Sequence, residues 1–393
     1  MTMRILPPGA AGADGAAAAP EPAMHLALWR LIGAGRLDPD AIRDFIAQNE
    51  APLVDPWSLT FLFHGSADAV YLVRFIHGGP GGLPLTRIEG TDLWHVRLPV
   101  EPGARFEYKL DVVRGGHGEW ITDPLNPHRA EDPFGSNSVA MGFDYERPEW
   151  SKPRGAAAGR FEEMAIDSAA FGETRGVRVY LPAGYLGDRA YPLLIVHDGD
   201  DFVAFANLTT VLDNLIDAGD IPPVVAALTQ TPHRMDEYVR GRHHARFLTR
   251  ELLPRLEQRY SLVRQPHGRV LLGASLRAVV SLSTAWRYPG TYGGQILKSG
   301  SFILDDSLLE GRHPLFHRIA RHVAALRRVA GAPAARAFVS AGNFEGLFGQ
   351  NRELAEFLRS RGVEVLFNES WDGHHWHNWR DQLRDGLIFT LVR

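Results

Sequence analysis

Residues 270–278 read Val-Leu-Leu-Gly-Ala-Ser-Leu-Arg-Ala, an apolar run that passes through Gly273 and Ser275 directly into helix-forming residues. A buried strand that ends in Gly-x-Ser and turns sharply into a helix holds the serine in a strained backbone conformation, with its Oγ exposed. The stretch therefore predicts a nucleophilic serine at the end of a central strand. The usual pattern has a second glycine two residues after the serine, and here that position is Arg277.

Length and composition indicate an ordinary globular protein. The chain has 393 residues, 45% of them hydrophobic and 22% charged, and this length favours two domains. A net charge of −4 gives no reason to expect nucleic acid or an anionic membrane as a partner. The chain has no cysteine, which excludes disulfides, thiolate catalysis and cysteine-ligated metals.

The N-terminal segment lacks the features of a signal peptide. Residues 7–22 are rich in Ala, Gly and Pro, which interrupt the continuous apolar core that a signal peptide needs. The sequence has no run of about 18 apolar residues. We therefore expect a disordered leader, no membrane association and a cytoplasmic location, and the oligomeric state stays open.

Hydrophobic patterning divides the chain into four parts. Residues 1–50 predict a disordered leader and short helices, with Asp38 as a helix N-cap. Short β-rich runs between Gly-, Pro- and Asp-rich turns predict an immunoglobulin-like β-sandwich over 51–148. Residues 149–160 are rich in Pro, Gly and charge and predict a linker. Over 161–393 strand and helix patterns alternate, which predicts a mostly parallel sheet with helices on both faces. Together with the serine turn, this predicts the α/β-hydrolase fold.

The individual elements follow from the same patterns. In the sandwich we expect strands at 59–64, 69–76, 93–100 and 106–113. In the C-terminal domain we expect strands at 177–182, 192–199, 222–229, 270–274, 294–302, 336–342 and 363–370, and helices at 203–218, 244–260, 278–288 and 351–362.

Two later loops supply the partners that a nucleophilic serine needs. In an α/β-hydrolase the nucleophile, the acid and the histidine follow in that order, each after a strand. A neutral imidazole accepts the serine proton, and a carboxylate orients the imidazole. The loop after 336–342 carries Glu345, and the loop after 363–370 carries His374, His375 and His377. Asp372, Asp305 and Asp306 are alternative acids.

The oxyanion of the tetrahedral intermediate needs backbone N–H donors. The first candidate is Leu276, because it directly follows the nucleophile and begins a helix. The loop after the strand at 192–199 is expected to supply a second donor, around Gly199 and Asp200.

A set of motifs runs through the C-terminal two-thirds of the chain. With these motifs the chain resembles the enterochelin (ferric siderophore) esterases of the esterase D group. The stretches are VRVYLPAGY (177–185), LLIVHDGDDF (193–202), FLTRELLPRLEQRY (247–260), GASL (273–276), YGGQILKSGSF (292–302), AGNFEGLFGQNRELAEFL (341–358) and DGHHWHNWRDQL (372–383).

The resemblance selects among the candidate residues. The family's glycine–histidine element, followed by a Trp-Arg pair, corresponds to Gly373-His374 and Trp379-Arg380, so His374 is the implied base, with His375 as the alternative. The family's acid corresponds to Glu345, three residues after Gly342. The resemblance implies a serine esterase without a cofactor that cleaves siderophore lactone esters through an acyl-enzyme, with iron release in the cytoplasm.

The N-terminal part also resembles this family, whose hydrolase domain follows a carbohydrate-binding early-set sandwich. The matching stretches are Gly90-Thr91-Asp92-Leu93-Trp94 and Asp123-Pro124-Leu125-Asn126-Pro127. Two interpretations of the sandwich aromatics Trp57, Trp94 and Trp120 stay open, namely core packing and a sugar-stacking platform.

Arg277 departs from the family, which has small residues at this position. A side chain that extends into the substrate cleft would either hold an anionic substrate group or block the site. We predict activity with an altered pocket, with a catalytically impaired binding protein as the alternative. Another alternative is an esterase for other acyl or feruloyl-type esters, for which the sandwich is a carbohydrate module.

Other residues are candidates for binding. Arg277, Arg234 and Trp376 are predicted to contact the substrate. The basic run Arg234, Arg240, Arg242 and Arg246 either holds an acidic ferric catecholate or is an exposed charged segment. The histidines of the 372–377 loop lack metal-site spacing, so we predict packing and no metal. His243 and His244 are predicted to lie on a solvated helix face.

Overall fold

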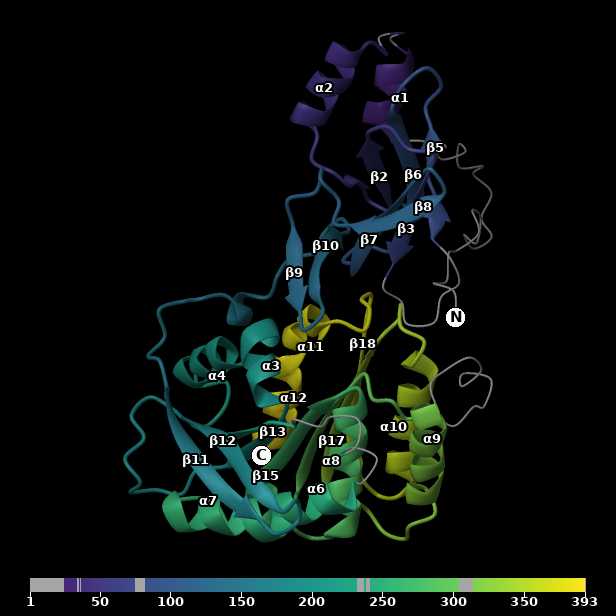
Figure 1. The fold of residues 1–393 in the computed structure, drawn as a ribbon. Helices are drawn as coiled ribbons and strands as arrows, with labels where there is room; N and C mark the ends of the chain where they lie inside the picture. The colour runs from purple at the N-terminus through teal and green to yellow at the C-terminus, as the bar shows by residue number, and fades with distance from the viewer. Residues whose placement is uncertain are drawn as a thin grey trace, which may run out of the picture. The chain divides into compact units, whose positions relative to one another are not determined.

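The computed structural model describes residues 25–33, 35, 37–74, 82–231, 237, 241–303 and 314–392, so the predicted leader lies outside the described residues. Two compact units make up the chain (Figure 1). The first unit is Met1–Glu146 with the short stretches Asn343–Gly346 and Ser370–His375. The second unit is Arg147–Gly342, Leu347–Glu369 and Trp376–Arg393. Both short stretches therefore belong to the first unit, whereas the predicted boundaries assign them to the C-terminal domain.

The first unit contains two antiparallel sheets with a shared core. One sheet has the strand order β1-β2-β6-β5 and the other β4-β3-β7-β10-β9, with β8 paired to β7. Alternate side chains of both sheets meet between them, as where Phe61 packs edge-on against Tyr108 at 4.8 Å. The predicted sandwich is therefore confirmed. Its strands are β1 (Leu53–Asp55), β2 (Ser58–His64), β3 (Ala69–Arg74), β4 (Leu83–Pro84), β5 (Thr86–Arg87), β6 (Leu93–Pro99), β7 (Arg105–Arg114), β8 (His117–Ile121), β9 (Arg129–Asp132) and β10 (Gly135–Met141).

Two helices cover the outer face of the β1-β2-β6-β5 sheet. Helices α1 (Leu26–Gly33) and α2 (Pro39–Gln48) pack against outward-facing side chains that include Leu62 and Leu93. This contact explains why nearly all of β2 is buried instead of alternating between buried and exposed residues. The Asp38 carboxylate accepts two backbone N–H groups at the start of α2, which confirms the predicted N-cap.

The second unit is built on one eight-stranded sheet with the order β11-β12-β14-β13-β15-β16-β17-β18. Strands β14, β13, β15, β16 and β17 run parallel, and β12 pairs antiparallel with both β11 and β14. The predicted, mostly parallel sheet is thus confirmed. The strands are β11 (Arg160–Ser168), β12 (Glu173–Leu181), β13 (Leu193–His197), β14 (Val225–Thr229), β15 (Arg269–Ala274), β16 (Gly294–Lys298), β17 (Arg336–Gly342) and β18 (Glu364–Ser370).

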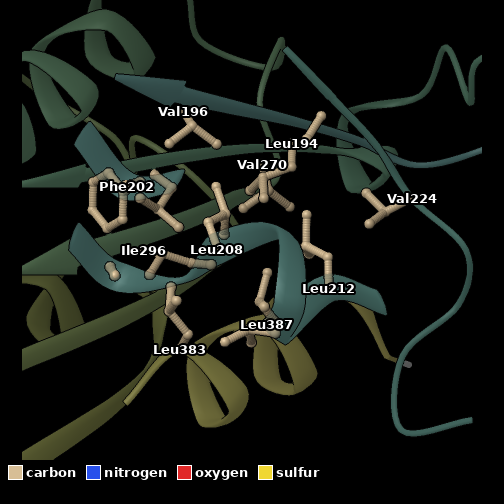
Figure 2. Packing of buried hydrophobic residues seen from close by; sticks show 14 of the residues in the cluster. Leu194, Val196, Phe202, Leu208, Leu212, Val224, Val270, Ile296, Leu383 and Leu387 are labelled. Atoms are coloured by element: carbon tan, nitrogen blue, oxygen red, sulfur yellow. The ribbon is translucent and has the colours of Figure 1, made fainter. Parts of the chain in front are cut away.

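Helices cover both faces of this sheet (Figure 1). Along β13, Leu194 and Val196 join the core under α3, α4, α11 and α12 (Figure 2), while Leu193 and Ile195 join the core under η2 and α7. The helices are α3 (Gly199–Ala206), α4 (Leu208–Asp217), α6 (Arg242–Arg246), α7 (Leu253–Arg259), α8 (Leu276–Arg287), α9 (Pro314–Leu326), α10 (Phe348–Ser360), α11 (Trp376–Asp381) and α12 (Leu383–Leu391), with a π-helix, η2 (Phe247–Leu252), and 3₁₀ turns η1 (Glu149–Ser151) and η3 (Pro266–Gly268).

Several predicted elements differ from those in the structure. The helix predicted at 203–218 is two helices, α3 and α4, separated by Asn207 in the left-handed conformation with φ 50°. The helix predicted at 244–260 is interrupted by the π-helical η2. Edge strand β11 was missed, because its exposed polar residues give little hydrophobic signal. Within the parts of the chain that the structure describes, every helix is too short or too polar to span a bilayer.

Candidate active site

Ser275 lies on the sharp turn between β15 and α8, as predicted. Its backbone angles, φ 56° and ψ −124°, fall outside the regions that residues with a side chain favour. The Ser275 N–H donates to the carbonyl oxygen of Lys298 at 2.9 Å, and its own carbonyl accepts the Ser301 N–H at 3.1 Å. The polypeptide after β16 therefore holds the turn in place.

Gly273 allows the helix to approach the strand closely. A Cβ at this position would lie 2.5 Å from the carbonyl oxygen of Arg277 and 2.9 Å from the backbone nitrogen of Ala278. Since real Cβ atoms do not approach backbone atoms so closely, only glycine fits without displacement of α8.

The Arg277 side chain is buried among partners in the second unit. Only 8% of it is exposed, and its guanidinium hydrogen-bonds the Asp198 carboxylate. The Asp201 carboxylate lies 3.5 Å from it, and the Trp376 ring centroid lies 5.9 Å away. Two carboxylates therefore already compensate this charge, and the predicted contact of Arg277 with the substrate stays a prediction.

The predicted oxyanion-hole residues lie at two helix N-termini. Gly199 and Asp200 begin α3, and Leu276 begins α8. The first N–H groups of a helix have no partner within the helix and point toward positions where negative charge is stabilised. A Cβ on Gly199 would lie 2.4 Å from Cβ of Leu228, and the Asp200 carboxylate pairs with Arg178. The binding of an oxyanion by these N–H groups stays a prediction.

The structure brings His374 and Glu345 together in the first unit. His374 Nδ1 lies 2.6 Å from Glu345 Oε2, and the two side chains are 8% and 1% exposed. The backbones of their stretches are also bonded, since the Phe344 N–H donates to the carbonyl of Asp372 at 3.1 Å. A carboxylate at Nδ1 keeps the proton on that nitrogen and leaves Nε2 as the acceptor, which is the state that a general base needs.

The alternative acid and base have other partners. Asp372 is bonded to Arg105 at 3.1 Å, and His375 is buried 3.6 Å from Glu107. Burial lowers the pKa of His375 to about 4, so its ring is neutral at neutral pH. These contacts favour Glu345 and His374 over Asp372 and His375. The alternative acids Asp305 and Asp306 lie outside the described residues, as do the predicted binding residues Arg234 and Arg240.

Two polar residues near Ser275 were not predicted. Ser301 Oγ lies 3.4 Å from Ser275 Oγ. Lys298 is fully buried with its Nζ 5.0 Å from the centre of the Phe338 ring, and burial lowers the pKa of this lysine to about 7. The sequence signal was the polar run Lys298-Ser299-Gly300-Ser301 directly after a buried strand.

The prediction of a solvated face at His243 and His244 was wrong for His244. His244 is buried, and its Nε2 lies 3.1 Å from His197 Nδ1 at the end of β13. Burial lowers the pKa of His244 to about 4 and brings the pKa of His197 well below its ordinary value. His243 is exposed, as predicted, and so are Arg242 and Arg246.

The tryptophans fall into two groups. Trp94 is in the sandwich core and donates to the Gly65 carbonyl at 3.2 Å, whereas Trp57 and Trp120 are 58% and 56% exposed. Trp376 packs edge-on against Phe202 in the core of the second unit, and its predicted contact with the substrate stays a prediction. Among the described residues, no three His, Asp or Glu side chains are grouped as metal ligands.

The sheet order, the strained serine turn and the buried histidine–carboxylate pair are together characteristic of α/β-hydrolase esterases. Residues 168–390 match the model of the Esterase family, whose description reads "Putative esterase". This match spans more than half of the chain, so the chain belongs to the Esterase family and is a carboxylic ester hydrolase.

Two curated proteins illustrate the relationship. The chain is 26% identical over 239 residues to the uncharacterized protein YjcH of Bacillus subtilis (strain 168), which covers 58% of this chain and 96% of YjcH. It is 26% identical over 282 residues to the iron(III) enterobactin esterase of Yersinia enterocolitica, which covers 58% of this chain and 80% of that protein.

Solved structures show that the fold is shared. The crystal structure of ferric enterobactin esterase from Salmonella typhimurium has a TM-score of 0.68 at 20% identity, over 85% of this chain and 93% of the other. The enterobactin esterase of Shigella flexneri, solved in the presence of enterobactin, has a TM-score of 0.67 at 20% identity, over 84% and 92%. A ferulic acid esterase has a TM-score of 0.52 at 17% identity, over 60% and 98%. The predicted α/β-hydrolase fold and the resemblance to enterochelin esterases are thus confirmed.

Gly273→Ala tests the geometry of the serine turn. The new Cβ would collide with the backbone of α8, and a displacement of about 1 Å costs on the order of 100-fold in activity. We expect such a loss in kcat with a simple aryl ester. Gly349→Ala is the matched control, because a Cβ there, in α10, meets no atom within 4 Å. Full activity of the Gly273→Ala protein would contradict the predicted role of this turn.

The buried histidines predict a stability that depends on pH. Because the folded pKa of His244 is about 4 and its ordinary value is 6.5, the unfolded chain binds the proton first as the pH falls. The stability that neutral His244 provides is therefore lost between pH 6.5 and pH 4, by about 3 kcal/mol. In urea unfolding at a series of pH values, His244→Gln should flatten this dependence, while His243→Gln should leave it unchanged. An unaltered slope in His244→Gln would refute the prediction.

Proposed function

We propose that this protein is a serine esterase with Ser275 as nucleophile, His374 as general base and acid, and Glu345 as the group that orients His374. The 2.6 Å bond between His374 Nδ1 and Glu345 Oε2 carries the proposal, since it gives a buried imidazole the required tautomer. The strained backbone of Ser275 supports it, because strain of this kind is retained where it presents a reactive group.

The proposed reaction has two steps. In the first, Ser275 Oγ attacks the ester carbonyl carbon while its proton passes to His374 Nε2, and Leu276, Gly199 and Asp200 are the candidate N–H donors to the oxyanion. The tetrahedral intermediate then expels the alcohol, which takes up the proton from His374. In the second step water attacks the acyl-enzyme with His374 again as base, and the acid leaves with Ser275 regenerated. These residues supply all the proton transfers without a cofactor.

The proposed substrates are lactone esters of catecholate siderophores, with iron release in the cytoplasm. Support comes from the iron(III) enterobactin esterase of Yersinia enterocolitica and from the shared fold with structures solved in the presence of enterobactin. An anionic ferric catecholate also suits the exposed guanidinium groups of Arg242 and Arg246. Feruloyl-type esters are the alternative, favoured by the fold shared with a ferulic acid esterase.

Ser275→Ala tests the nucleophile. With p-nitrophenyl acetate the unaltered protein should release a burst of p-nitrophenol, and Ser275→Ala should abolish it and lower kcat by at least about 1,000-fold. Ser301→Ala is the matched control, because its hydroxyl lies 3.4 Å from that of Ser275, and we expect it to keep the burst. A burst that survives in Ser275→Ala and disappears in Ser301→Ala would show that Ser301 carries the acyl group, and would contradict the assignment of Ser275 as the nucleophile.

A hydrolysis screen with mass detection tests the substrate class. Ferric and iron-free catecholate trilactones should be cleaved with kcat/KM at least about tenfold above that for methyl ferulate, because substrate discrimination of this size needs only about 1.4 kcal/mol. A preference for methyl ferulate would support the feruloyl alternative and overturn the siderophore assignment.

A further inference from the structure

A buried group of charges in the first unit contacts the stretch that carries His374. Arg105 of β7 donates to both carboxylate oxygens of Asp372, at 3.1 and 3.3 Å, and to Glu107 Oε1 at 2.9 Å. These three side chains are at most 7% exposed. Asp372 is two residues before His374, so this cluster fixes the chain next to the proposed base.

Strand β7 also binds the residues on either side of His374. The Arg105 backbone N–H donates to the Trp371 carbonyl at 2.8 Å. The Glu107 N–H donates to His375 Nε2 at 3.4 Å, and Glu107 Oε2 lies 3.6 Å from His375 Nδ1. A neutral His375 can accept with Nε2 and keep its proton on Nδ1, which agrees with the lowering of its pKa by burial. Residues before and after His374 are therefore both fixed by the same strand.

The stretch that carries Glu345 is bound to the same unit. Phe344 lies in the sandwich core, with its ring 5.9 Å from Phe106 of β7 and 5.9 Å from Trp371. The Asn343 N–H donates to the Ser370 carbonyl at 2.8 Å. The two partners of the 2.6 Å His374–Glu345 bond thus both rest on one strand of the sandwich.

The Arg105–Asp372 ion pair is buried, which limits how much it adds to the stability of the fold. Desolvation offsets most of the attraction between buried charges, and apolar replacements of such pairs are often neutral or stabilising. The planar Arg105 guanidinium binds two carboxylates at once, because Nη1 donates to Asp372 and Nη2 donates to Glu107, so it fixes Asp372 relative to Glu107 of β7. The Arg105–Asp372 pair therefore fits a role in orienting the 371–375 stretch.

We propose that Arg105 is a positioning residue for His374, which acts through Asp372 and the backbone of Trp371. The proposal rests on the proposed function, because it takes His374 as the general base. It gives the N-terminal sandwich a part in the esterase reaction that does not depend on carbohydrate binding.

Arg105→Met tests this role. With a p-nitrophenyl ester, and per folded protein, kcat should fall about 10- to 100-fold while KM changes less than about threefold, since a misplaced base slows the reaction without weakening binding. Arg105→Lys keeps the charge and should recover part of kcat. The acidic limb of the pH profile of kcat/KM should move in Arg105→Met, because the base has new surroundings.

Arg97→Met is the matched control in the same unit. Arg97 of β6 pairs with Asp55 at 3.5 Å and Ser58 at 2.9 Å, and its loss should leave kcat and the pH profile unchanged. If Arg105→Met does not fold, the isosteric Asp372→Asn replaces it, with the same expected fall in kcat. Wild-type kcat in the folded variant, or an equal fall in Arg97→Met, would overturn the proposal.

His374→Ala, measured in parallel, distinguishes failure of the positioning role from failure of the proposed function. Loss of activity in His374→Ala together with full activity in Arg105→Met would overturn only the positioning role of Arg105. Full activity in His374→Ala would overturn the proposed function, and the positioning role that rests on it.

Discussion

The strained, positive-φ backbone of Ser275 is the constraint that the surrounding elements of the second unit must hold in place. A residue at φ 56° and ψ −124° costs about 1–3 kcal/mol and persists only where its surroundings fix it. Here the surroundings are a parallel sheet buried on both faces, a glycine that lets α8 approach β15, and the bonds of Ser275 to the chain after β16. The sequence patterns that accompany these features are apolar strands, Gly273 and a helix that begins directly after Ser275.

Two buried arginines near the candidate residues are each paired with carboxylates of their own unit. Arg277, which replaces a small residue of the family, pairs with Asp198, and Arg105 pairs with Asp372 and Glu107. Removal of one partner from such a pair leaves an uncompensated charge, which costs far more than the pair contributes. The arginine that makes the serine motif atypical is therefore paired with the residue that directly precedes α3, Asp198.

Strong local patterns allowed prediction, and contacts between distant residues did not. The strand and helix on either side of Ser275 were predicted, since a buried run followed by helix formers has few other solutions. Glu345 and His374 followed from the order of loops and from the family resemblance, and the structure brings them into contact. His244 was wrongly placed on a solvated face, because its partner His197 is 47 residues away in sequence. The Arg277–Asp198 pair spans 79 residues, and no pattern in the sequence indicates it.

Covalent labelling tests most directly whether Ser275 is a nucleophile activated by His374. Trypsin cleaves after Arg269 and Arg277, so residues 270–277 form one peptide whose mass reports modification of Ser275. After reaction with a fluorophosphonate at neutral pH, we expect one phosphonyl group on this peptide in the unaltered protein. In His374→Gln the labelling should be slower by at least about 100-fold, because the serine loses its general base. An unlabelled peptide, or equal labelling rates in both proteins, would contradict the assignment.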